Sequence, residues 1–107
     1  MKIYRHGDIL LKEIENLPKN LKPLNHGILA EGEFTGHKHE LKPVKVATKP
    51  SFQIYQDEKG ETYVEILEPS EITHQEHKTL RIEKGIYYIQ HEREYNPFEK
   101  KIEEVRD

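Results

Sequence analysis

Apolar and polar residues alternate along this chain in short runs, which is the period of a half-buried β-strand. The apolar positions are filled mainly by Ile, Val, Tyr, Phe and Thr, whereas Ala occurs only at Ala30 and Ala47. β-Branched and aromatic residues favour pleated sheet over helix. The predicted strands cover residues 3–14, 27–33, 41–47, 52–56, 62–67, 79–82 and 86–91, and the first is expected to bend or bulge at Gly7.

Glycine and proline mark the connections between these strands. Pro18 and Pro23 predict a loop over residues 16–25. Gly60 and Gly85 each lie in a short polar segment between two strands, which predicts one hairpin over residues 52–67 and another over residues 79–91.

The last twelve residues have a different pattern. Asn96 is a good N-cap, Pro97 suits the first helical position, and the apolar residues that follow recur at helical spacing. We therefore expect one short C-terminal helix over residues 96–107. The remaining short antiparallel strands are too many for a wide flat sheet, so the fold class is predicted to be mainly β, either a small antiparallel barrel or a two-sheet sandwich.

The length of 107 residues fits one domain, 1–107. Apolar residues make up 34% of the chain and charged residues 35%, which predicts a thin core. No run approaches the roughly 18 apolar residues of a membrane span, and the N-terminus lacks the apolar segment of a signal peptide. We expect a cytoplasmic protein without a membrane partner. An edge strand would allow a homodimer.

The chain contains no cysteine, so a metal ion would have to be held by histidine and carboxylate side chains. His37 and His39 are two residues apart, which in a strand places both imidazoles on one face. His74 and His77 are three residues apart, and Thr73 with Glu76 has the pattern of a capping box that would align them on a helical turn. These four histidines are the predicted metal ligands.

The number of candidate ligands does not determine the identity of the metal. Four imidazoles would close a tetrahedral zinc site, whereas three imidazoles with a carboxylate or water would suit Fe, Mn, Ni or catalytic Zn. Glu40 and Glu76 are the candidate general bases, and His6 could either join the site or serve as a proton shuttle. Asp8 would either orient an imidazole or satisfy backbone N–H groups.

The net charge of −3 is too small to indicate a partner, but the segment after His37 is basic. Lys38 and Lys42 are candidate contacts to an anionic small molecule or RNA, although a solvated lysine-rich strand edge explains them equally well. Arg93 and Tyr95 are candidates for binding a phosphate group. The alternative role for Arg93 is a surface ion pair.

Two resemblances follow from these motifs. Residues 32–40, with two glycines followed by His37, His39 and Glu40, resemble the first metal motif of the cupin superfamily. That resemblance implies a small β-barrel holding Fe, Mn, Ni or Zn. Residues 7–11, 35–39, 74–77 and 91–95 resemble motifs of a group of small prokaryotic proteins with no established activity, which implies that the four histidines belong together.

The first functional hypothesis is a metal-dependent enzyme that hydrolyses a phosphoester in a nucleotide or RNA. A cupin-like oxygenase or isomerase is the alternative enzyme class. A module in which the metal only stabilises a thin core and the basic edge binds nucleic acid or protein is the non-catalytic alternative. A metal-free fold with unrelated histidines is the remaining hypothesis.

Overall fold

The computed structural model describes residues 1–31, 37–45 and 49–91. These residues form strands joined by turns and loops, and none of the described residues lies in a helix long and apolar enough to cross a membrane. The helix predicted over residues 96–107 lies outside the described residues, as do Arg93 and Tyr95. The strands are β1 (Ile3–His6), β2 (Ile9–Ile14), β3 (Lys22–Leu24), β4 (Ile28–Glu31), β5 (Lys38–Pro43), β6 (Phe52–Gln56), β7 (Thr62–Ile66), β8 (Ser70–Thr73), β9 (Leu80–Ile82) and β10 (Gly85–His91).

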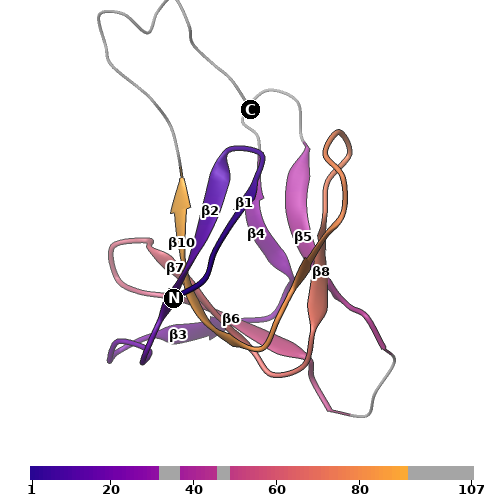
Figure 1. The fold of residues 1–107 in the computed structure, drawn as a ribbon. Helices are drawn as coiled ribbons and strands as arrows, with labels where there is room; N and C mark the ends of the chain where they lie inside the picture. The colour runs from indigo at the N-terminus through magenta and orange to yellow at the C-terminus, as the bar shows by residue number, and fades with distance from the viewer. Residues whose placement is uncertain (32–36, 46–48, 92–107) are drawn as a thin grey trace, which may run out of the picture.

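The strands build two antiparallel sheets. One has six strands in the order β1-β2-β10-β7-β6-β3, and the other has four in the order β4-β5-β8-β9. Figure 1 shows the two sheets facing each other at an angle. The prediction of a mainly β fold is confirmed, and of its two alternatives the sandwich is correct and the closed barrel is not.

The hydrophobic core lies between the sheets and follows the alternation of the strands. Every second residue points inward, as in β2, where Ile9 and Leu11 are fully buried, and in β7, where Val64 and Ile66 are buried. The four-stranded sheet contributes one buried apolar residue from each strand, Leu29, Leu41, Ile72 and Ile82. The core therefore joins the two sheets and fixes which face of each strand turns toward the interior.

The first predicted strand is two strands. Gly7 and Asp8 form a two-residue turn that pairs β1 with β2, and His6 lies directly opposite Ile9. Gly7 has a φ of +64°, a conformation that glycine adopts at low cost and that the first position of a type II′ turn requires. The glycine was expected to mark a bend, and it reverses the chain direction.

The other predicted hairpins and loops agree with the structure only in part. The hairpin over residues 52–67 is confirmed by the pairing of β6 with β7. The loop predicted over residues 16–25 contains β3, which pairs with β6 despite Pro23 because it lies at a sheet edge. The hairpin over residues 79–91 is wrong, because β9 pairs with β8 in one sheet and β10 pairs with β2 and β7 in the other.

Candidate functional site

Five histidines gather at one end of the sandwich. Figure 1 shows that the turn between β1 and β2, the start of β5 and the loop between β8 and β9 lie at the same end of the molecule. These segments carry His6, His37, His39, His74 and His77. We call these five residues the histidine cluster.

The rings of the cluster are close neighbours. The centroids of His39 and His74 are 4.4 Å apart, as are those of His74 and His77. His37 lies 5.5 Å from His74, and His6 lies 5.0 Å from His39 and 5.7 Å from His77. The structure therefore brings the four predicted metal ligands together and adds His6 to them.

The cluster bridges the two sheets through His6 and His39. Both side chains are buried, and the residues are only 4% and 2% exposed. His6 ends β1 of the six-stranded sheet, His39 lies in β5 of the four-stranded sheet, and their Nδ1 atoms are 2.8 Å apart. Each ring uses its other nitrogen differently: His6 Nε2 is 2.8 Å from the Lys78 carbonyl oxygen, and His39 Nε2 is 3.1 Å from Asp8 Oδ1.

These contacts restrict where the protons can lie. A carbonyl oxygen only accepts, so His6 Nε2 carries a proton and donates it to Lys78. An ionised Asp8 also only accepts, so His39 Nε2 carries a proton too. If both imidazoles are neutral, their Nδ1 atoms therefore present two lone pairs to each other, and a shared proton would make this contact a hydrogen bond.

Burial disfavours the shared proton. It is the largest cause that lowers the pKa of His39 to about 4, and the positive forms of His74 and His6 lower it further, against the opposing effect of Asp8. Burial also lowers the pKa of His6, opposed by its hydrogen bond to Lys78. The pKa of His74 is lowered in the same way, first by burial and then by the neighbouring His77 and His37. Burial and the neighbouring rings therefore favour the neutral forms of His6, His39 and His74, in which one ring nitrogen of each is a Lewis base.

His77 adds a further unsatisfied nitrogen. Its Nε2 atom is buried and has no hydrogen-bond partner among the described residues. Buried polar atoms are nearly always paired, so an unpaired one asks for an explanation such as a bound ion or water. A methyl group at Gly7 would lie only 2.6 Å from this atom and 2.9 Å from His39 Cε1, so the turn between β1 and β2 packs closely over both rings.

His37 and Glu76 lie at the exposed rim of the cluster. His37 Nδ1 is 3.6 Å from Glu76 Oε1, and the Glu76 side chain is 61% exposed. His74 Nδ1 accepts a hydrogen bond from the Glu76 N–H at 3.0 Å. The helical turn predicted around these residues is wrong, because residues 74–79 form a loop with bends, in which the His74 ring satisfies the backbone.

The other predicted site residues in β5 turn away from the cluster. His39 and Leu41 point inward, so the alternation of the strand places Glu40, Lys38 and Lys42 on the opposite face. Lys38 contributes only its backbone nearby, where its N–H donates to Gln75 Oε1 at 3.0 Å. Glu76 is thus the candidate base that the fold brings to the cluster.

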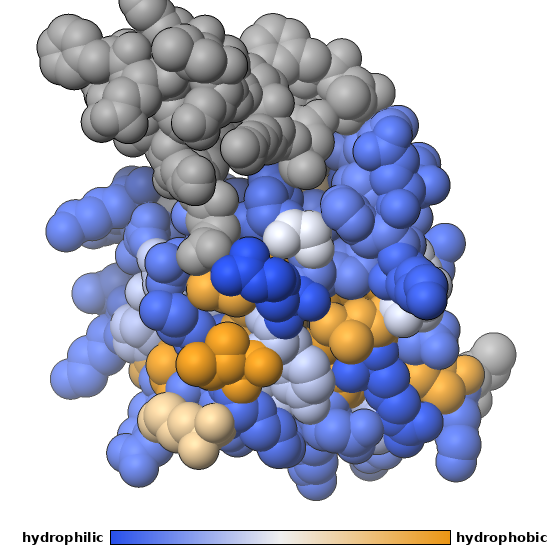
Figure 2. All heavy atoms as spheres, turned by 45° about the horizontal axis from the view of Figure 1, so that its top comes forward, coloured by the Kyte–Doolittle hydropathy of each residue, from blue (hydrophilic) through white to orange (hydrophobic). Residues whose placement is uncertain are grey.

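The side chains of the cluster do not form a coordination site in the arrangement that the structure shows. As they stand, no group of three or more His, Asp or Glu side chains within residues 1–31, 37–45 and 49–91 has the arrangement needed to hold a metal ion. Figure 2 tilts the top of Figure 1 toward the viewer, and the part of this face that is not grey shows mainly hydrophilic side chains, with smaller apolar areas between them. The donor types, imidazoles with a carboxylate nearby, fit a transition metal.

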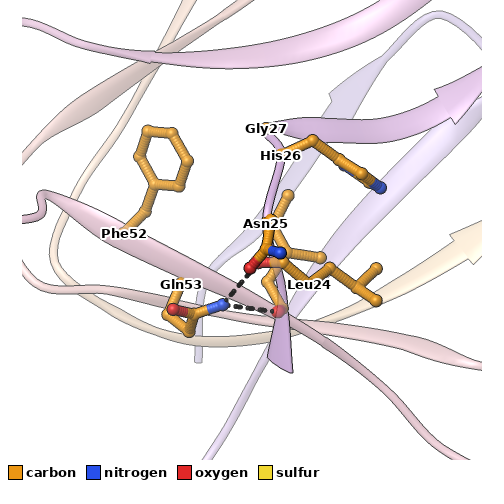
Figure 3. A pocket seen from close by; sticks show the side chains of 7 residues that line it. Leu24, Asn25, His26, Gly27, Phe52 and Gln53 are labelled. Carbon is orange, nitrogen blue, oxygen red and sulfur yellow. Dashed lines mark hydrogen bonds between the residues drawn. The ribbon is translucent and has the colours of Figure 1, made fainter. Parts of the chain in front are cut away.

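A surface pocket elsewhere, called the hollow below, has fewer functional groups than the histidine cluster. It measures about 300 Å³ and is lined by Leu24, Asn25, His26, Gly27, Phe52, Gln53 and Ile54. Figure 3 shows the Gln53 amide in this hollow, which donates to the carbonyl oxygens of Leu24 and Ile54 at 2.8 and 2.9 Å. Its best-placed polar group is therefore already used by the fold, and the histidine cluster remains the candidate site.

Sequence reasoning missed two features of the cluster. The Lys78 carbonyl that holds His6 is a backbone group, for which the sequence has no signal. The close packing of Gly7 was also missed, although a glycine next to a histidine and an aspartate is typical of a close backbone approach. Asp8 does orient His39, which is one of the two roles expected for it.

Comparison with known proteins shows one family. Residues 5–92 match a family described as a domain of unknown function, DUF8820. The chain belongs to this family, because the match covers most of its length. Neither a curated protein nor a solved structure matches the chain.

Proposed function

We propose that the histidine cluster binds one divalent transition-metal ion. The observation that carries this proposal is the 2.8 Å contact between His6 Nδ1 and His39 Nδ1, with the outer nitrogen of each ring already donating to Lys78 or Asp8. Histidines that bind a metal characteristically donate their other ring N–H to a carboxylate or a backbone carbonyl. Both partners of this kind are present here.

The donor set follows from the contacts. His6 and His39 would bind through Nδ1, and His77 would bind through the buried Nε2 that has no partner among the described residues. His74 would complete the set through Nε2, since its Nδ1 accepts the Glu76 N–H. His37, expected to be a ligand, would instead stand at the rim beside Glu76. The proposal gives His6 a ligand role in place of proton transfer.

Elemental analysis of the untagged full-length protein tests this proposal. We expect about one transition-metal ion per chain in the wild type and in His26→Ala, whose imidazole lies outside the cluster. We expect the ion to be lost in His39→Ala. Wild-type protein that neither contains a metal nor takes up Zn, Mn, Ni or Fe(II) on addition would refute the proposal.

Asp8 is expected to set the affinity of the site. Asp8→Asn keeps an oxygen near His39 Nε2 but removes the negative charge that strengthens the imidazole as a ligand. We expect the affinity for the metal to fall by about 10- to 100-fold, the usual loss when such an outer partner is replaced. Competition with a chelator measures it. Asp57→Asn, the same change in the turn between β6 and β7, is the control and should leave the affinity unchanged.

For the reaction, we propose hydrolysis of a phosphoester. When bound, a divalent ion supplies Lewis-acid activation of water and of a phosphoryl oxygen. Glu76 would accept the proton from the attacking water, because its carboxylate is exposed at the rim next to His37. The inward face of the cluster would exclude bulk water. No substrate contact is assigned to Lys38 or Lys42, which lie on the other face of β5.

The two candidate bases of the sequence provide a matched test. Glu76→Gln is expected to lower the hydrolysis of bis(p-nitrophenyl) phosphate by about 100-fold or more, the typical contribution of a general base. Glu40→Gln, on the opposite face of its strand, is expected to remain close to wild type. Equal losses in both variants would exclude Glu76 as the base.

A structural role for the metal is the second candidate function. It is supported by the origin of the ligands, because His6 belongs to one sheet and His39 to the other. An ion held by both would cross-link the sheets of a protein with a thin core. Metal binding and metal-dependent stability without phosphoester hydrolysis would favour this function over the catalytic one.

A further inference from the structure

The two sheets differ in the side chains that they turn away from the core. In β5 of the four-stranded sheet, the outward residues are Lys38, Glu40 and Lys42. In β8 of the same sheet, they are Glu71 and Thr73. Charged and polar residues are what an antiparallel sheet normally shows on a face in water. The six-stranded sheet departs from this pattern, because most of its outward side chains are apolar or aromatic.

The centre of this outer face is a row of three tyrosines from adjacent strands. Tyr88 of β10 pairs with Tyr63 of β7, and Tyr63 pairs with Tyr55 of β6. The ring centroids of Tyr63 and Tyr88 are 5.3 Å apart. Half-buried aliphatic residues in β2 and β10 extend the row, since they alternate with buried core residues and so point to the same side. We call this set the tyrosine face: Leu10, Ile14, Tyr55, Tyr63, Ile86 and Tyr88.

Such a face is typical of an interaction surface. Apolar residues that gather on one side of a protein mark binding sites more often than residues that are scattered singly. Tyrosine is also enriched at protein interfaces, where its ring packs and its hydroxyl remains able to form hydrogen bonds. The four-stranded sheet covers the opposite face of these strands, where the core lies.

The charged residues around the tyrosine face are separated by sign. The basic residues Arg5 and Lys12 come from β1 and β2, at one side of the sheet. The acidic residues lie on the other side of β10, with Glu65 in β7 and Glu61 just before it. Glu61 accepts a hydrogen bond from the Tyr88 hydroxyl, which places its carboxylate at the face. The face therefore has a basic half and an acidic half.

A second copy of the chain would match these charges. In a two-fold dimer the same surface meets itself, and an axis that runs along the strands, between the two facing sheets, exchanges the halves of the face. The middle of the sheet lies between β10 and β7, so this axis places β2 of one copy over β6 of the other, and β10 over β7. The basic half of each copy then covers the acidic half of its partner.

From this charge pattern we propose that the protein forms a homodimer in which the tyrosine faces of two copies pack on each other. Antiparallel sheets pack in this way within many proteins, with their strands about 30° apart and the facing side chains interdigitated. Single-stranded nucleic acid also stacks on aromatic residues of a sheet, but Glu61 and Glu65 would repel its phosphates. The inference does not depend on the proposed metal site, whose histidines lie outside the tyrosine face.

Exchanging the charges of the two halves provides the test. Sedimentation equilibrium of the full-length protein is expected to show a dimer. Lys12→Glu places a carboxylate opposite the acidic half of the partner, and Glu65→Lys places an ammonium group opposite the basic half. Each change alone should weaken the dimer at least about 10-fold, because like charges then face each other. An equal mixture of the two variants should form a heterodimer, since opposite charges meet again. Lys42→Glu, on the outer face of the other sheet, is the control and should remain dimeric.

Recovery in the mixture supports the inference and also shows that both variants are folded. A wild-type protein that stays monomeric at every concentration overturns it, and would leave the tyrosine face to residues 92–107 of the same chain, to another protein or, if it binds single-stranded RNA, to nucleic acid. Dimers of Lys12→Glu and Glu65→Lys that are as stable as the wild-type dimer overturn it as well, because the two copies would then meet elsewhere. A mixture that does not recover would exclude the two-fold arrangement.

Discussion

Replacing Gly7 by alanine is expected to weaken metal binding by about 10- to 100-fold, the loss seen when the groups that orient metal ligands are disturbed. The added methyl group would lie 2.6 Å from His77 Nε2 and 2.9 Å from His39 Cε1, so both rings must move. The backbone contributes a second effect, because Gly7 has a φ of +64°. An L-residue in the left-handed region costs roughly 1–2 kcal/mol of stability.

Gly60→Ala separates these two effects. Gly60 has a φ of +86° in the turn between β6 and β7, and a methyl group there meets no atom within 4 Å. This control should therefore lose a similar free energy of unfolding, measured by urea denaturation, while chelator competition shows an unchanged metal affinity. If Gly7→Ala binds metal as tightly as Gly60→Ala, the close packing of the turn over the rings has no role in the site.

Some of the strands could be predicted because they follow local patterns. The alternation of apolar residues gave β6 and β7 within one residue of their bounds, and Gly60 marked their turn. β3 was missed because Lys22, Pro23 and Leu24 pair at a sheet edge, where only the neighbouring strand favours an extended backbone. The assignment of β9 and β10 to different sheets depends on contacts far apart in the sequence, which the alternation cannot show.

In the histidine cluster, too, local spacing could be predicted and long-range contacts could not. The short spacings of His37 with His39 and of His74 with His77 indicated two pairs, and the structure brings both pairs together. The part played by His6 depends on the hairpin turn at Gly7, which carries β1 to the end of the sandwich where β5 begins. That contact spans 33 residues and has no local pattern.

The sequence did not determine on which side of the sheet the Glu40 side chain lies, and the reason is physical. Adjacent residues of a strand point to opposite faces, so a glutamate next to His39 cannot share its side of the sheet. The sequence left two glutamates as candidate bases because the extent of the strand around Glu40 was not known. Once β5 begins at Lys38, its period places Glu40 outside, and Glu76 is left at the rim.

Metal binding is expected to raise the stability of the protein by a large amount. An ion that binds only the folded state, present at a free concentration 100 times its dissociation constant, adds about 2.7 kcal/mol to the free energy of unfolding. For a chain of this length that corresponds to a rise in Tm of roughly 10 °C or more. The gain is expected to depend on His6 and His39, whose Nδ1 atoms face each other at 2.8 Å across the two sheets.

The double variant His6→Ala, His39→Ala is therefore expected to show no rise in Tm when the metal is added. Each protein is compared with itself, with and without metal, so the cavity that the two missing rings leave in the variant cancels. His26→Ala, His91→Ala removes the same number of imidazoles from exposed positions outside the cluster and should keep the full rise. A metal-dependent rise that survives in the first variant would place the bound ion away from the interface between the sheets, and the proposed ligand set would then fail.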